Sequence, residues 1–182
     1  MTSTAARNIV ILSAIAAAAA LRLVPHPPNF TPIGAMALFS GAYLGRRGGI
    51  AFAAPLGALL LSDAILGFYS GMAVNYFAVA LIVLLGNLAL RQVAPLRLLG
   101  TALAASVVFF VVSNLGVWAG SGMYPLTAAG LAACFVAAVP FFQNTLAGDL
   151  FYSAVLFGGF ALLERSLPQL RTAPVATSPL RR

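Results

Sequence analysis

Six apolar stretches constrain this chain more than any other feature of its sequence. They cover residues 8–24, 33–44, 50–68, 76–90, 98–118 and 145–163. A helix needs about 20 residues to cross the hydrocarbon core of a bilayer, so the second and fourth stretches are short for a crossing. Hydrophobic residues make up 62% of the chain, against about 45–50% in a soluble domain. The pattern predicts an all-α integral membrane protein, a bundle of six transmembrane helices.

The basic residues predict the orientation of this bundle. The chain has ten basic residues, and all of them are arginines. In the six-helix topology nine of them fall at the N-terminus, the 2–3 turn, the 4–5 turn and the C-terminal segment, and only Arg22 falls on the other side. The positive-inside rule then places both termini in the cytoplasm. Because topology explains the net charge of +7, we expect no nucleic-acid partner.

Three segments qualify this topology. Residues 168–182 are rich in proline, threonine, serine and arginine, so the transmembrane domain is expected to span residues 1–167 and to be followed by a disordered cytoplasmic tail. Residues 128–139 are apolar but too short to cross alone, and predict a short outer helix that ends at Pro140. The first stretch has an alternative as a secretory signal, because Arg7 precedes an apolar run with small residues at 16–20. That alternative would leave five crossings.

Small residues recur at four-residue spacing in the first two stretches. The series in the second stretch continues from Ala37 through Gly41 and Gly45 to Gly49. Small side chains let helices approach closely in lipid, so residues 33–44 are expected to form a packing helix. The predicted partner-docking residues are Ala14, Ala18, Gly41 and Gly45.

Polar residues are concentrated on the side opposite to the arginines. Four prolines between residues 25 and 32 predict a stiff, extended connection there, and Asp63 and Asp149 lie within helices near the same side. An outward-facing polar and aromatic cup is what a solute site in a membrane bundle requires. The candidate substrate-binding residues are His26, Asn29, Thr31, Asp63, Tyr69, Asn75, Tyr76, Asn114, Trp118, Tyr124, Asn144 and Asp149. Two alternatives stay open: these are ordinary interfacial residues, or Arg22 neutralises Asp63 or Asp149.

Catalysis has less support in the sequence. Without lysine there is no Walker A motif, and no GxSxG or HExxH pattern occurs. The single His26 and single Cys134 are too few for a multi-ligand zinc site. Either could occupy an axial position on a metal held in a macrocycle, although a polar loop residue and a small core residue are the simpler interpretations. We therefore expect no catalytic residues and no cofactor of the chain's own, with an intramembrane enzyme that uses Asp63 and Asp149 as an alternative.

Two parts of the chain resemble known membrane families. Residues 32–67, PIGAMALFSGAYLGRRGGIAFAAPLGALLLSDAILG, resemble the second and third helices of the substrate-binding S components of energy-coupling factor (ECF) vitamin transporters. Those helices show small residues at every third or fourth position, a basic inner turn and an Asp that closes the next helix. The alanine stripe of the first stretch is similar to the face by which such components dock on their coupling subunit. The segments PHPPNFTPIGAMALF and GLAACFVAAVPFFQNTLAGDLFYSAVLFGGFALLER resemble an uncharacterised, S-component-like family of small bacterial membrane proteins.

This resemblance implies a protein of the bacterial cytoplasmic (inner) membrane that captures a vitamin or cofactor under the 1–2, 3–4 and 5–6 loops. Uptake would need an ECF-type coupling subunit and ATPases, or a solitary toppling mechanism. Cobalamin is the favoured substrate, because stand-alone S-component-like proteins of Gram-negative bacteria are associated with it and its cobalt would give Cys134 or His26 a role. The alternative from a different class is a structural or scaffold subunit of a membrane or cell-envelope complex, whose outer polar residues pair with one another and leave no cavity.

Overall fold

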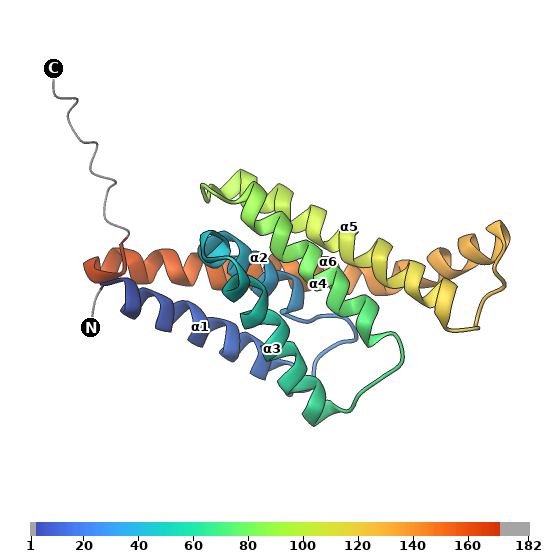
Figure 1. The fold of residues 1–182 in the computed structure, drawn as a ribbon. Helices are drawn as coiled ribbons and strands as arrows, with labels where there is room; N and C mark the ends of the chain where they lie inside the picture. Colours follow the sequence, from blue (N-terminus) through green and yellow to red (C-terminus); the bar gives the residue numbers. More distant parts are fainter. Residues whose placement is uncertain (1–2, 172–182) are drawn as a thin grey trace, which may run out of the picture.

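Residues 3–171, which the computed structural model describes, fold into six α-helices and two short 3-10 helices. The elements are α1 (Ser3–Leu21), α2 (Ile33–Leu44), η1 (Gly45–Arg47), α3 (Gly49–Leu66), α4 (Met72–Ala89), α5 (Pro95–Gly120), α6 (Ala128–Ser166) and η2 (Pro168–Leu170). Successive helices run back and forth, so that α1 begins and α6 ends at the same end of the bundle (Figure 1). The all-α class predicted from the apolar stretches is confirmed.

Five of these helices are long and apolar enough to cross a membrane, and α2 is not. The 12 residues of α2 rise about 18 Å, whereas the hydrocarbon core is about 30 Å thick. Most of α2 is buried inside the bundle, at Gly34, Ala35, Met36, Ala37, Leu38, Phe39, Ser40, Gly41 and Leu44. The described helices thus include five candidate spans and a short central helix, so the predicted count of six crossings is not confirmed. It confirms α2 as the packing helix.

The crossing of α2 and α4 is close enough to require glycine. A β-carbon at Gly41 would overlap the carbonyl oxygen of Val83, and a β-carbon at Gly86 would overlap that of Leu38. A β-carbon at Gly45 would overlap a side chain of α4. Gly41 and Gly45, which the sequence assigned to docking a partner, are therefore covered by α4 of the same chain.

The last helix, α6, is continuous over 39 residues, or about 58 Å at the usual helical rise. The side chain of Thr127 caps its first turn by accepting a hydrogen bond from the Gly130 amide. The expectation of a separate outer helix that ends at Pro140 is wrong, because the helix continues through this proline. An internal proline removes one backbone hydrogen bond, and membrane helices tolerate this where neighbouring groups compensate. Figure 1 shows the end of α5 and the start of α6 projecting beyond the other connections.

Contacts of Arg7 close the end of the bundle where α1 begins. Its guanidinium group lies 3.0 Å from Glu164 Oε1 and 3.0 Å from the carbonyl oxygen of Leu170. It also lies over the rings of Tyr43 and Phe160, 5.3 and 5.2 Å from their centroids. Leu170 is buried and η2 contacts α1, so residues 168–170 are packed against the bundle and do not belong to the expected tail. The rest of that predicted tail, residues 172–182, lies outside the described residues.

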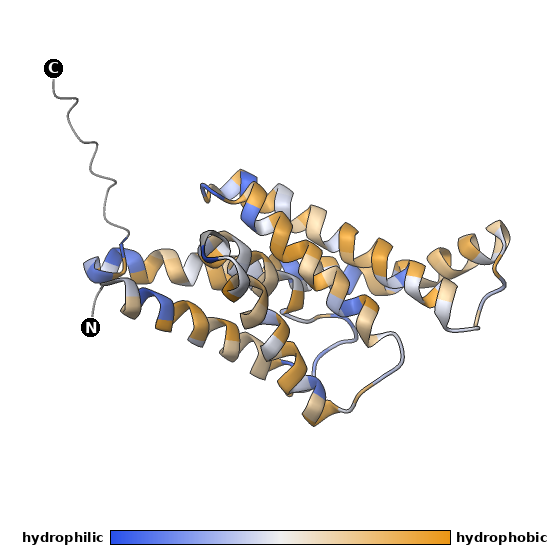
Figure 2. Ribbon diagram, viewed as in Figure 1, coloured by the Kyte–Doolittle hydropathy of each residue, from blue (hydrophilic) through white to orange (hydrophobic). Residues whose placement is uncertain are grey.

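The outer surface of the helices is apolar. Figure 2 shows hydrophobic residues along the helices and hydrophilic residues mostly at their ends and in the connections. Large apolar side chains are exposed on several helices, for example Leu61 at 71%, Phe77 at 59% and Leu162 at 62%. Such a surface is unfavourable in water and suits hydrocarbon. Together with the five long helices, it identifies a multi-pass membrane protein.

Candidate functional site

A buried ion pair joins the end of α1 to α3. Arg22 Nη2 lies 2.7 Å from Asp63 Oδ1, and the two side chains are 9% and 1% exposed. The other terminal nitrogen of Arg22 donates to the hydroxyl of Ser62. Tyr76 donates its hydroxyl to Asp63 Oδ2 at 3.0 Å. Both carboxylate oxygens therefore have a donor, and of the two neutralising partners considered for Arg22 the structure selects Asp63.

The second intramembrane carboxylate, Asp149 of α6, has a different environment. The residue is 3% exposed, and the hydroxyl of Ser106 donates to its Oδ2 at 2.6 Å. Its Oδ1 faces the first turn of α2, where a β-carbon at Gly34 would overlap it. The ion pairs described within residues 3–171 are Arg7–Glu164 and Arg22–Asp63, so neither involves Asp149.

Two adjoining cavities lie at the end of the bundle that carries the 1–2, 3–4 and 5–6 connections. The smaller cavity, of about 250 Å³, reaches Arg22, Gly34 and Asp149. The larger, of about 510 Å³, lies between α4, α5 and α6. Five residues line both cavities, namely Asn29, Tyr69, Asn75, Phe109 and Thr145. The common lining makes the smaller cavity an inward extension of the larger one.

The larger cavity combines hydrogen-bonding groups with aromatic surface. Asn75, Ser113 and Asn114 supply amide and hydroxyl groups from α4 and α5. Phe110 and Phe141 supply aromatic faces from α5 and α6. An apolar wall with a few convergent polar groups is typical of a site for a small organic molecule.

Six of the twelve predicted site residues line these cavities, and six do not. Those that do are Asn29, Thr31, Tyr69, Asn75, Asn114 and Asp149. Asp63 and Tyr76 belong to the buried network of Arg22. Trp118 donates its indole N–H to the carbonyl oxygen of Pro125 and does not line either cavity. The lining also does not include His26, Tyr124 or Asn144.

Sequence reasoning missed several of the lining residues. Phe109 and Phe110 lie inside an apolar stretch, where nothing distinguishes a phenylalanine that faces a cavity from one that faces lipid. Ser113 and Thr145 each donate a hydrogen bond to the helix backbone one turn earlier, a common arrangement in apolar helices. For Thr145 a signal existed, because it lies four residues before Asp149 on the same helix face.

The positions of Cys134 and His26 do not support the axial-ligand role considered for them. Cys134 is 2% exposed, and its thiol lies 3.5 Å from the carbonyl oxygen of Asn114. His26 is exposed, with Nδ1 3.0 Å from the carbonyl oxygen of Pro27. Neither residue lines a cavity described above. Within residues 3–171, no three His, Cys, Asp or Glu residues form a group suited to a metal ion.

The connection between α1 and α2 is held in a defined shape over the smaller cavity. The side-chain amide of Asn144 in α6 donates to the carbonyl oxygen of Pro28 at 2.9 Å. Phe30 packs against two aromatic rings of α6, at centroid distances of 5.8 and 5.5 Å. Asn29 has a φ of 63°, a left-handed conformation that asparagine tolerates better than most residues. These contacts confirm a non-helical connection of defined shape, but it is not extended throughout, because the Phe30 amide donates to the carbonyl oxygen of Pro27 in a turn.

Residues 2–170 match the sequence pattern of DUF6580, which is described as a family of unknown function. The chain belongs to DUF6580. The match runs from the start of α1 through η2, so it includes every helix that positions the site. No curated protein and no solved structure matches the chain.

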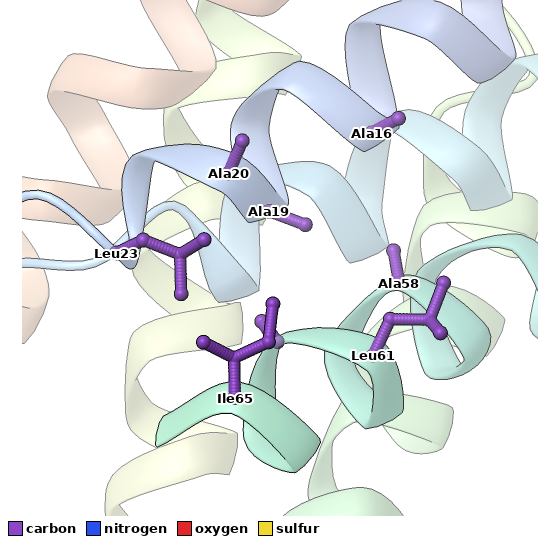
Figure 3. A pocket seen from close by; sticks show the side chains of 8 residues that line it. Ala16, Ala19, Ala20, Leu23, Ala58, Leu61 and Ile65 are labelled. Carbon is purple, nitrogen blue, oxygen red and sulfur yellow. The ribbon is translucent and has the colours of Figure 1, made fainter.

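In this DUF6580 chain the alanine face of α1 is divided between the core and an open groove. Of the two alanines assigned to docking a partner, Ala18 is 3% exposed and covered within the chain, whereas Ala14 is only half-buried against the core. An apolar groove of about 190 Å³ remains between α1 and α3. Its lining residues are Ala16, Ala19, Ala20, Leu23, Ala58, Leu61, Ser62 and Ile65. Figure 3 shows the alanines of α1 on one side of this groove and Ala58, Leu61 and Ile65 of α3 on the other.

Proposed function

We propose that this protein binds a small organic solute within the membrane bundle, taking it up from the end that carries the 1–2, 3–4 and 5–6 connections. The observation that carries the proposal is the cavity of about 510 Å³ with its inward extension of about 250 Å³. Sites for drug-sized ligands have volumes of about 300–1,000 Å³. The bias of the arginines favours an orientation in which this end faces the outside of the cell.

The lining favours a ligand of vitamin-like chemistry, with a flat ring and several polar substituents. Phe109, Phe110 and Phe141 offer surfaces for a ring. Asn29, Asn75, Asn114 and the neighbouring hydroxyl groups offer donors and acceptors for substituents. This combination is consistent with the S-component resemblance, and uptake across the membrane would then require a separate coupling subunit and ATPases, or toppling.

The cobalamin form of this proposal has the least support. In that form Cys134 or His26 would coordinate the cobalt, and neither residue lies in the cavity lining. A corrin ring with its side chains is also much larger than the drug-sized ligands that suit such a volume. We therefore propose a smaller vitamin or cofactor precursor.

The cavities also separate this proposal from its two alternatives. A scaffold subunit was expected to pair its polar residues with one another, and the Arg22–Asp63–Tyr76 network does so. The cavities next to that network favour binding over a scaffold role. An enzyme using both carboxylates would need them together, whereas Asp63 bonds to Arg22 and Tyr76, and Asp149 bonds to Ser106.

A cavity-filling variant tests the proposal. The wild-type protein in detergent or nanodiscs is titrated with riboflavin, thiamine, biotin, haem and cobalamin, using the fluorescence of Trp118 beside the cavity wall at Val117. We expect saturable binding of at least one compound. Ser113→Phe should weaken it by about tenfold or more, because the added ring occupies the larger cavity.

The matched control is Leu115→Phe, which adds the same ring on the opposite face of α5. Leu115 is 40% exposed and lies outside the lining, so affinity should stay within about twofold of the wild type. Equal weakening by both variants would contradict binding in this cavity. If none of the compounds, nor the amines and alcohols named below, binds the wild-type protein, the proposal of solute capture is overturned.

A further inference from the structure

Asp149 is the acidic residue of the cavity lining, and it has no cationic partner among the described residues. Asp63 is matched by Arg22, and Glu164 by Arg7. Asp149 receives one described hydrogen bond, to Oδ2 from the neutral hydroxyl of Ser106. A carboxylate within a membrane bundle is costly unless a partner or water compensates it, and such residues mark sites where ligands or ions bind.

The surroundings of Asp149 hold its carboxyl group in place at the edge of the smaller cavity. Gly34 leaves room for its carboxylate against the first turn of α2, since a β-carbon there would overlap Oδ1. The first amide groups of a helix lack partners within the helix, and its positive end favours a nearby anion. Gly34 and Asp149 both line the smaller cavity, although Asp149 is only 3% exposed. A buried, oriented acceptor thus lies at the inner end of the space that the ligand would enter.

The nearby cation does not compete for this acceptor. Arg22 lines the same cavity, but its guanidinium group is held by Asp63 and Ser62. Because Arg22 is matched by Asp63, ionisation of Asp149 would leave these three residues with one excess negative charge. The cavity should therefore attract a cation or a strong hydrogen-bond donor and disfavour an anion.

We infer that the ligand carries a cationic nitrogen, such as a primary ammonium or a charged ring nitrogen, that pairs with Asp149 while its ring lies in the larger cavity. The inference rests on the proposed solute-binding function and specifies its ligand class. The amide and hydroxyl groups around the cavity orient the remainder of the ligand, and the Asp149 carboxylate selects its charge.

Matched pairs of compounds test this inference on the wild-type protein. The pairs are benzylamine and benzyl alcohol, pyridoxamine and pyridoxine, and tryptamine and tryptophol, which differ chiefly in an amino against a hydroxyl group. Binding is measured by calorimetry and thermal shift in nanodiscs near neutral pH. We expect at least one amine to bind about tenfold or more tightly than its alcohol, as a charge-assisted hydrogen bond to a buried carboxylate requires.

Two variants locate this preference. Asp149→Asn keeps the shape of the side chain but removes its charge, and should reduce the amine-to-alcohol ratio to about one. Glu164→Gln removes a carboxylate at the opposite end of the bundle and should leave the ratio unchanged. If Asp149→Asn does not fold, the wild-type comparison decides alone. Alcohols or the anion biotin binding as tightly as the amines would overturn the inference and leave solute capture standing, whereas no binding by any compound would overturn both.

Discussion

Replacing Arg22 with alanine should lower the free energy of unfolding by about 3–5 kcal/mol, the usual effect of leaving a buried charge without its partner. The reason is the environment of Asp63, which is 0% exposed and receives Arg22 Nη2 at 2.7 Å. Without the guanidinium group, only the hydroxyl of Tyr76 still donates to that carboxylate. Unfolding of purified protein in mixed micelles, followed by circular dichroism, measures the change.

A double variant distinguishes lost charge balance from lost packing. Arg22→Met with Asp63→Leu removes both charges and keeps apolar volume, so it should recover most of the stability lost in Arg22→Ala. Glu164→Gln is the comparison at the other ion pair, whose side chains are 14% and 27% exposed, and should cost about 1 kcal/mol or less. A loss in Arg22→Ala no larger than that of Glu164→Gln would contradict a buried, mutually dependent pair.

Adding a methyl group at the crossing of α2 and α4 should also destabilise the protein strongly. Gly41→Ala and Gly86→Ala place a β-carbon against the carbonyl oxygens of Val83 and Leu38, which belong to the backbone and cannot rotate away. The helices must then separate, and we expect each variant to lose about 2–3 kcal/mol of unfolding free energy, the upper part of the range for overpacking. The same micelle unfolding assay measures the loss.

Two other glycines provide the control, because the same substitution to alanine should not lower the free energy of unfolding there. Gly57 in α3 and Gly100 in α5 lie within helices, and a β-carbon at either would meet nothing within 4 Å. Alanine stabilises a helix by up to about 1 kcal/mol relative to glycine, so Gly57→Ala and Gly100→Ala should be neutral or stabilising. If all four variants behaved alike, helix propensity rather than close packing would explain the effect.

Much of the fold followed from local composition. The stretch predicted at residues 33–44 begins and ends at the residues that bound α2, and its glycine spacing predicted a close-packed helix. The break expected at Pro140 shows where local reasoning failed. Proline often ends or kinks a helix, whereas α6 continues through Pro140.

The residues of the candidate site were predicted only in part, because composition identifies polar residues but not the direction in which an apolar side chain points. Asn29, Asn75 and Asp149 were expected because polar residues are rare in an apolar chain and mark its polar side. Phe109 and Phe110 were not expected, since an aromatic residue in an apolar stretch has the same composition signal whether it faces lipid or a cavity.

The sequence by itself determined the class of this protein: apolar helices, and glycines at the spacing of a close crossing. Each of these is a property of neighbouring residues, so it can be identified without knowing the fold. Only the tertiary structure decided which charged residues pair with one another. Arg7 meets Glu164 across 157 positions of sequence, and Arg22 meets Asp63 across 41. Asp149 has no cationic partner among the described residues, because the nearby Arg22 pairs with Asp63. Partners depend on which helices lie side by side, and that follows from packing the whole bundle rather than from any single segment.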